Sequence, residues 1–199
     1  MKSGWATAVL LAGPARAPRA ADRRAIDLSD PAVPSSRQPY HAVMGASRPN
    51  EKKLERYLRK VVERVTGRSV RALLKDYRAS GHDVRGVALV VGSDIDPAKI
   101  ANDHIRAHAL EGRLFRTVLE ARMTASGLPC GVVLEREVYA RAAGVLERPE
   151  AELRKTLAEL GRSLDGPWRA DEKTATLAAW MMLGRRRLPA GKGMGKGGP

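Results

Sequence analysis

The sequence predicts an α/β protein in which strands alternate with helices along the second half of the chain. The clearest strand is the continuous apolar run of residues 86–91, which is typical of a strand buried on both faces of a sheet. Helical periodicity with capping residues dominates the chain beyond residue 101. Hydrophobic residues make up 43% of the 199 residues, so we expect one domain over residues 1–184.

The chain is expected to open with a β-hairpin. Residues 5–12 form an apolar run that ends at Gly13 and Pro14, and residues 23–28 alternate like a second strand. Residues 29–49 contain four prolines, which predicts a long loop instead of a helix or strand.

A helix is predicted to begin at Asn50 and to end near Gly81. Its apolar positions change direction around Gly67, so we expect two helical pieces. Residues 86–91 should then form the central strand of the sheet. A helix over residues 102–126 and a strand over residues 131–134 follow.

Three further helices are predicted in the C-terminal part. They cover residues 138–145, a segment that begins after Pro149, and residues 171–183, which are apolar on most sides and therefore buried. Residues 185–199 combine three arginines with repeated Gly and Lys and lack apolar periodicity, which predicts a disordered basic tail.

The formal net charge of +14 is unevenly distributed. Residues 51–80 hold 10 basic and 4 acidic side chains, residues 185–199 hold 5 and none, and residues 81–184 hold 14 and 15. This asymmetry suits a polyanion partner, although an arginine-rich surface without a partner is the alternative. A single cysteine, Cys130, indicates a reducing, cytoplasmic location, and no segment reaches membrane-spanning length.

The predicted helix over residues 50–80 carries a basic stripe. Its cations recur at spacings of three and four, so a continuous helix would place them on one face, away from most of its acids. We assign these cations, together with three arginines of the tail, as candidate nucleic-acid contacts. The alternative is that they only form a solvated face of the helix. The candidates are Lys53, Arg56, Lys60, Arg64, Arg68, Arg71, Lys75, Arg78, Arg185, Arg186 and Arg187.

A second constellation lies on the helix over residues 102–126. His104, His108 and Glu111 fall at i, i+4 and i+7, a spacing that permits a divalent metal site. Phe115 and Leu119 share this side, so a core role for His108, with a hydrogen-bonded partner, is the simpler interpretation.

Two short stretches resemble a known family. Gly-Trp-Ala-Thr-Ala-Val at residues 4–9 is similar to the second strand of RuvC-type resolvases and their YqgF-like relatives. Asp-Glu-Lys-Thr-Ala at residues 171–175 resembles their closing helix, whose pattern is Asp-x-x-Asp-Ala. The resemblance implies a ribonuclease H-like fold, a mixed sheet flanked by helices, over most of residues 4–183.

The same resemblance implies catalytic carboxylates at Asp94 or Asp96 and at Asp171. The family's first strand, with its metal-binding Asp, has no counterpart in residues 1–199, and Thr174 stands where another acid is expected. Two-metal phosphodiester cleavage needs several converging carboxylates. The resemblance therefore predicts a degenerate member without catalysis.

We expect a nucleic-acid-associated protein with a ribonuclease H-like body. Two alternatives remain open at this point. One is a non-catalytic interaction scaffold, such as a homodimer. The other is a nuclease with rearranged carboxylates that would use Mg or Mn; no other cofactor is expected.

Overall fold

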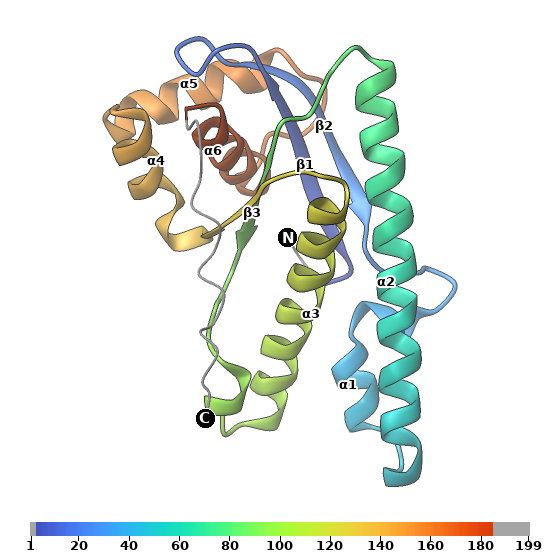
Figure 1. Ribbon diagram of the computed structural model, residues 1–199. Helices are drawn as coiled ribbons and strands as arrows, with labels where there is room; N and C mark the ends of the chain where they lie inside the picture. Colours follow the sequence, from blue (N-terminus) through green and yellow to red (C-terminus); the bar gives the residue numbers. More distant parts are fainter. Residues whose placement is uncertain (1–2, 185–199) are drawn as a thin grey trace, which may run out of the picture.

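A computed structural model describes residues 3–184 of the chain (Figure 1). It confirms the α/β class, with four strands arranged as two separate two-stranded sheets among the described residues. The predicted disordered tail, residues 185–199, lies outside the described residues. Within residues 3–184, no helix is both long enough and apolar enough to cross a lipid bilayer.

The first sheet is the predicted hairpin. Strands β1 (Trp5–Ala12) and β2 (Arg19–Asp27) pair antiparallel, with Trp5 opposite Asp27 and a register shift between Leu10 and Leu11. Gly13 ends β1 with a φ of +89°, a left-handed conformation that favours glycine. The hairpin is therefore confirmed, and β2 begins four residues earlier than the expected residue 23.

The proline-rich segment is not the loop that the sequence predicts. It contains a 3-10 helix, η1 (Pro34–Arg37), and a short helix, α1 (Pro39–Met44). Each helix has its proline in the first turn, where the missing N–H costs nothing and the fixed φ suits a helix. Proline starts helices here, whereas the prediction for residues 29–49 treated it as a helix breaker.

The predicted break at Gly67 is also wrong. Helix α2 (Arg48–Ala79) runs without interruption for 32 residues. Its apolar positions change direction because α2 packs against α1 and η1 in its first half and against β2 and α3 in its second half. Gly67 is buried within this continuous helix, and an added Cβ there would lie 3.4 Å from Nε of Arg122 on α3, a distance that the flexible arginine side chain tolerates.

The second sheet pairs β3 (Val87–Val91) with β4 (Cys130–Leu134) in parallel, Val87 lying opposite Cys130. A short 3-10 helix, η2 (Pro97–Lys99), and helix α3 (Asp103–Ala125) connect the two strands. The Asn102 side chain caps α3 by accepting a hydrogen bond from the Ile105 N–H at 3.0 Å. Among the described residues β4 is the only strand paired with β3, so β3 is not the central strand that the sequence predicts.

The three predicted C-terminal helices are confirmed as α4 (Val138–Leu146), α5 (Glu150–Arg162) and α6 (Ala170–Gly184). A short 3-10 helix, η3 (Glu135–Glu137), which was not predicted, precedes α4. As expected for a helix that is apolar on most sides, α6 is deeply buried, and its Leu177, Ala178 and Trp180 are completely inaccessible.

Two hydrophobic cores lie on opposite sides of the strands. Ala6 and Leu89 point to a core shared with α2 and α3 through Leu73 and Phe115. Leu11 of β1 and Val133 of β4 point to a second core, formed with α4, α5 and α6. The strands thus form a middle layer between the α2–α3 pair and the C-terminal helices (Figure 1).

Candidate functional site

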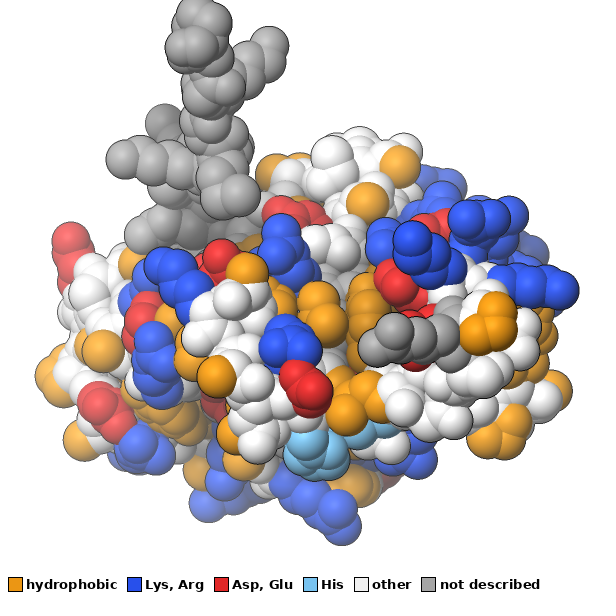
Figure 2. Space-filling view, turned by 90° about the horizontal axis from the view of Figure 1, so that it is seen from below, with side chains coloured by type: hydrophobic (Ala, Val, Ile, Leu, Met, Phe, Trp, Pro, Cys, Tyr) orange, Lys and Arg blue, Asp and Glu red, His pale blue; other side chains and the backbone are white. Residues whose placement is uncertain are grey.

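The basic stripe lies along the outer face of α2. At about 100° per residue, its eight cations fall within about 120° of arc around the uninterrupted helix. All of them, from Lys53 to Arg78, are exposed, while Leu58, Val62 and Val65 on the other side are buried. Figure 2 shows Lys and Arg side chains gathered at the upper right, on the side where α2 lies in Figure 1.

Acidic neighbours neutralise little of this stripe. Arg64 is paired with Asp30 at 2.8 Å. Within residues 3–184 the other seven stripe cations have no carboxylate oxygen within 4.0 Å. Two acids of α2 form ion pairs with arginines that are not part of the stripe: Glu55 with Arg59, and Asp76 with Arg24. The stripe therefore offers seven unpaired cations to solvent.

Polar contacts with the hairpin fix the inner side of α2. The Tyr77 hydroxyl donates to the Asp22 carboxylate at 2.9 Å, and Arg24 also binds Asp22 at 2.7 Å. Burial and the Asp22 charge raise the pKa of Tyr77 well above its usual range, so the hydroxyl remains a donor. The hydrogen bond to Asp22 also raises the pKa of Arg24. These contacts attach the inner side of α2 to the hairpin and leave the stripe facing outward.

The three arginines at 185–187, also proposed as contacts, lie outside the described residues.

The carboxylates predicted from the resemblance are placed as follows. Asp94 and Asp96 are exposed in the loop after β3. Arg116 donates a hydrogen bond to the Asp94 carboxylate. The Asp96 carboxylate lies 4.0 Å from the Arg113 guanidinium and accepts a hydrogen bond from the Ala98 N–H. Asp171 lies in the first turn of α6 and lines a groove between β1 and β3. Among the described residues these three aspartates form no group of ligands close enough to share one metal ion.

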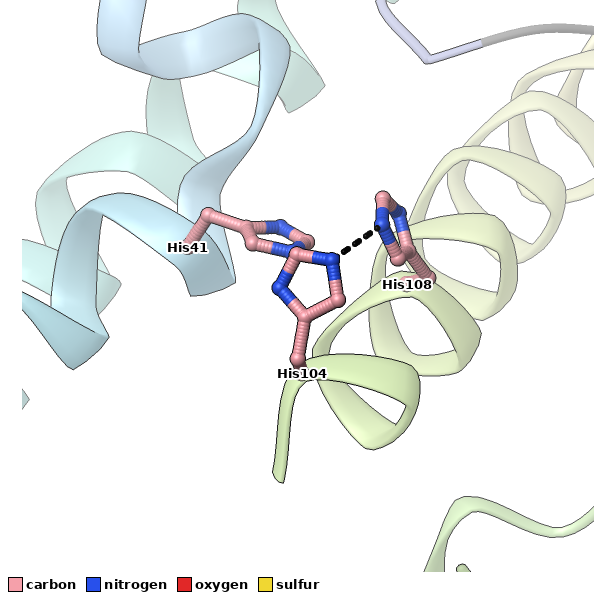
Figure 3. Close-up of side chains that lie close together, drawn as sticks. All are labelled: His41, His104 and His108. Carbon is pink, nitrogen blue, oxygen red and sulfur yellow. Dashed lines mark hydrogen bonds between the residues drawn. The ribbon is translucent and has the colours of Figure 1, made fainter. Parts of the chain in front are cut away.

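Histidines do form such a group. His104 and His108 from α3 meet His41 from α1, and one ligand nitrogen from each ring lies within 4.8 Å of the others (Figure 3). The Nε2 atoms of His104 and His108 are 3.3 Å apart. His108 is half exposed, which contradicts the predicted core role, and histidine side chains reach the surface at the lower centre of Figure 2.

Glu111 is the buried member of the cluster. Its carboxylate is fully inaccessible, and Oε1 accepts a hydrogen bond from Nδ1 of His41 at 2.8 Å and another from the His41 backbone N–H at 3.3 Å. The other oxygen, Oε2, lies 3.8 Å from Nδ1 of His108. The sequence therefore identified the correct helix face of α3, but Glu111 lies behind the histidines.

His41 was missed by the sequence analysis. It lies 63 positions before His104, in a segment that was predicted to be a loop. A weak signal existed, because the chain has only four histidines and three of them meet here.

The elongated basic stripe is the largest of these features and the histidine cluster is the most compact. No family model matches the chain, and no curated protein is significantly similar to it.

Proposed function

We propose that the protein binds nucleic acid through α2 and has a ribonuclease H-like body that does not cleave its ligand. The observation that carries this proposal is the uninterrupted helix, which aligns seven unpaired cations on one exposed face. A break at Gly67 would have divided this face into two shorter ones. The continuous stripe is therefore the specific support for a long, linear polyanion.

The dimensions of the stripe fit a nucleic-acid backbone. From Lys53 to Arg78 the helix rises about 38 Å, at about 1.5 Å per residue. One strand of a duplex carries a phosphate about every 3.4 Å along the axis, so several phosphates face the stripe at once. Long cationic side chains bind phosphates without reading bases, which makes the expected binding independent of sequence.

Absence of cleavage follows from the pairing of the carboxylates. Asp94 and Asp96 face Arg116 and Arg113, two cations that compete with metal ions for the same oxygens. Two-metal cleavage needs several carboxylates on both ions, and Thr174 offers only a hydroxyl. The ribonuclease H-like assignment rests on the residues 4–9 and 171–175 and on the order of hairpin, helix, strand, helix, strand and helices.

A charge-reversal experiment tests the proposal. Arg68, Arg71 and Lys75 are unpaired stripe residues, and their joint replacement by Glu should weaken binding of a short labelled DNA duplex by at least about tenfold at low salt. A matched control reverses Lys99, Lys155 and Arg162, which are exposed cations on other elements.

The control changes the net charge by the same amount, so it should lower the affinity only slightly. Equal losses from both triple variants would show that bulk charge, and not the α2 stripe, governs binding. Cleavage of the duplex in the presence of Mg or Mn would contradict the second part of the proposal.

A further inference from the structure

We propose that His41, His104 and His108 bind one zinc-type divalent ion and leave a fourth coordination position open to solvent. Imidazole nitrogen is a preferred ligand of zinc, and three protein ligands plus a solvent molecule form the usual open site. The site is separate from the α2 stripe, because its ligands come from α1 and α3.

The spacing of the nitrogens suits such an ion. At a Zn–N distance of about 2.0–2.1 Å, neighbouring ligands of a tetrahedral ion lie about 3.3–3.4 Å apart. The Nε2 atoms of His104 and His108 are already 3.3 Å apart. One nitrogen of His41 lies within 4.8 Å of a nitrogen from each of the other two rings, so a small movement of His41 completes the set (Figure 3).

Glu111 supplies independent evidence for a ligand. Its carboxylate has no solvent exposure, and Oε2 has no hydrogen-bond partner within the described structure. Nε2 of His41 is likewise buried and without a partner, while Nδ1 of the same ring is held by Glu111. A buried carboxylate that fixes the far nitrogen of a histidine is the usual outer partner of a metal-bound imidazole. An ion would give Nε2 of His41 the partner that it lacks.

The open position gives the site its chemical character. His104 and His108 are exposed, so a water molecule can occupy the fourth position and be exchanged for a small ligand. Zinc-bound water is acidic enough to supply hydroxide near neutral pH, which is the chemistry of hydrolytic zinc sites.

Zinc titration of the full-length chain, monitored by calorimetry and by metal analysis after dialysis, tests this proposal. We expect one zinc per chain, and cobalt in the same site should give the intense visible absorption of four-coordinate geometry. His104→Ala alters an exposed ligand and should preserve the fold, yet it should weaken zinc binding at least about 100-fold. Glu111→Gln should weaken it about 10–100-fold.

His82→Ala is the matched control, because His82 is the one histidine outside the cluster. It should leave the zinc affinity unchanged. Absence of stoichiometric binding at micromolar zinc would overturn the proposal. So would a His104→Ala variant that binds zinc as tightly as the unmodified chain, or a His82→Ala variant that loses it.

A second, independent inference concerns the groove between β1 and β3. We infer that this groove accepts an extended apolar peptide segment of about seven residues as an added strand. It has a volume of about 990 Å³ and is lined by residues 6–14 on one side and residues 82–90 on the other. Leu73 and Tyr77 of α2 and Met123 of α3 also contribute apolar lining.

The lining pattern identifies the β1 wall as a strand edge. A strand that presents one face to a groove contributes every second residue, whereas every residue from Ala6 to Ala12 lines this one. In an antiparallel pair, every second residue of a strand exchanges backbone hydrogen bonds with its partner strand, and the residues between them point their N–H and C=O groups the other way. The Leu28 N–H donates to the Gly4 carbonyl, so Ala6 and Ala8 are the next residues of β1 that bond to β2. Thr7 and Val9 therefore direct their N–H and C=O groups away from β2.

These outward groups of Thr7 and Val9 have no hydrogen-bond partner within the described structure. Unpaired backbone groups in a partly apolar groove favour a partner that brings complementary backbone groups. Each of the two hydrophobic cores contains residues of both β1 and β3, the two strands that flank the groove. A strand inserted between them would therefore bury apolar side chains on both of its faces. An extended apolar segment meets both requirements, because it supplies hydrogen bonds and side chains together.

A labelled seven-residue peptide of Val and Ala, flanked by glutamates for solubility, tests the inference with the full-length chain. We expect saturable binding measured by fluorescence anisotropy. The same peptide with alternate backbone nitrogens methylated should bind at least about tenfold more weakly, because it loses donors on one edge.

Val9→Pro removes an outward N–H of β1 and leaves the β2 ladder intact, so it should fold but lose peptide binding at least about tenfold. Equal binding of both peptides, or binding by Val9→Pro equal to the unmodified chain, would overturn the inference, as would no binding at all. A dimer that Val9→Pro dissociates would assign the groove to a second copy of the chain instead.

Discussion

The Nδ1 atom of His41 donates a hydrogen bond to the fully buried carboxylate of Glu111 at 2.8 Å, across 70 positions of the chain. The pair connects the short helix α1 to the middle of α3. A buried carboxylate is costly unless hydrogen bonds compensate it, so this contact ties the proline-rich segment to the body of the fold. It also orients one ring of the histidine cluster.

Loss of the His41 ring should therefore destabilise the protein. His41→Ala leaves the Glu111 carboxylate buried with fewer donors, and we expect the free energy of unfolding to fall by at least about 2 kcal/mol. Urea denaturation in the presence of a chelator measures this effect without any contribution from metal. Glu111→Leu combined with His41→Leu should recover part of the loss, because no buried charge then remains. A His41→Ala variant as stable as His82→Ala would contradict the account.

Gly67→Ala tests the continuity of α2. The added methyl group would meet only the flexible ends of Arg122 and Arg71 at 3.4 Å, and alanine is the better helix former. We expect the free energy of unfolding to rise by about 0.5–1 kcal/mol in a urea titration. A loss of stability would instead indicate that the backbone at Gly67 is not helical. An interruption of the helix at that residue would divide the stripe into two shorter ones.

Gly161→Ala in α5 provides the contrasting case. There the added Cβ would lie 2.4 Å from Cδ1 of Trp168, a ring that packs against the core and donates its N–H to the Leu157 carbonyl. Overpacking of this kind costs about 1–3 kcal/mol, so this variant should melt at a lower temperature than the unmodified chain. Equal melting temperatures would show that Trp168 is not held against α5.

Cys130 should react slowly in the folded protein. Burial, with a smaller contribution from Glu120, raises the pKa of its thiol to about 12. The thiolate is the reactive form, so alkylation by iodoacetamide at mildly alkaline pH should be at least about 100-fold slower than in concentrated urea. The raised pKa also predicts that stability falls as the pH rises above about 8.5, where only the unfolded thiol ionises. Equal alkylation rates in the two states would contradict this environment.

Local patterns predicted the order of elements well, because they report directly on backbone preference. The apolar run at residues 5–12, the glycine and proline that follow it and the cap expected at Asn102 or Asp103 each act within a few residues, and the structure assigns the cap to Asn102. The same rules failed in the segment around Pro34 and Pro39, where position within the helix determines whether proline is tolerated.

Long-range packing accounts for the remaining differences. The changing apolar face of α2 reflects different neighbours along one straight helix, and a sequence does not state which elements those neighbours are. The histidine cluster was half predicted for the same reason. Helical spacing revealed His104 and His108, whereas His41 joins them only through the docking of α1 on α3.

The salt dependence of nucleic-acid binding tests the central proposal most directly. Each phosphate contact contributes about −0.9 to the slope of the logarithm of the binding constant against the logarithm of the salt concentration for duplex DNA. The full-length chain should therefore show a slope steeper than about −4, and reversal of Arg68, Arg71 and Lys75 to Glu should flatten it by about 2–3. The control reversal of Lys99, Lys155 and Arg162 should change it by less than about 1. Equal flattening by both variants, or no measurable binding at low salt, would contradict a nucleic-acid interface on α2.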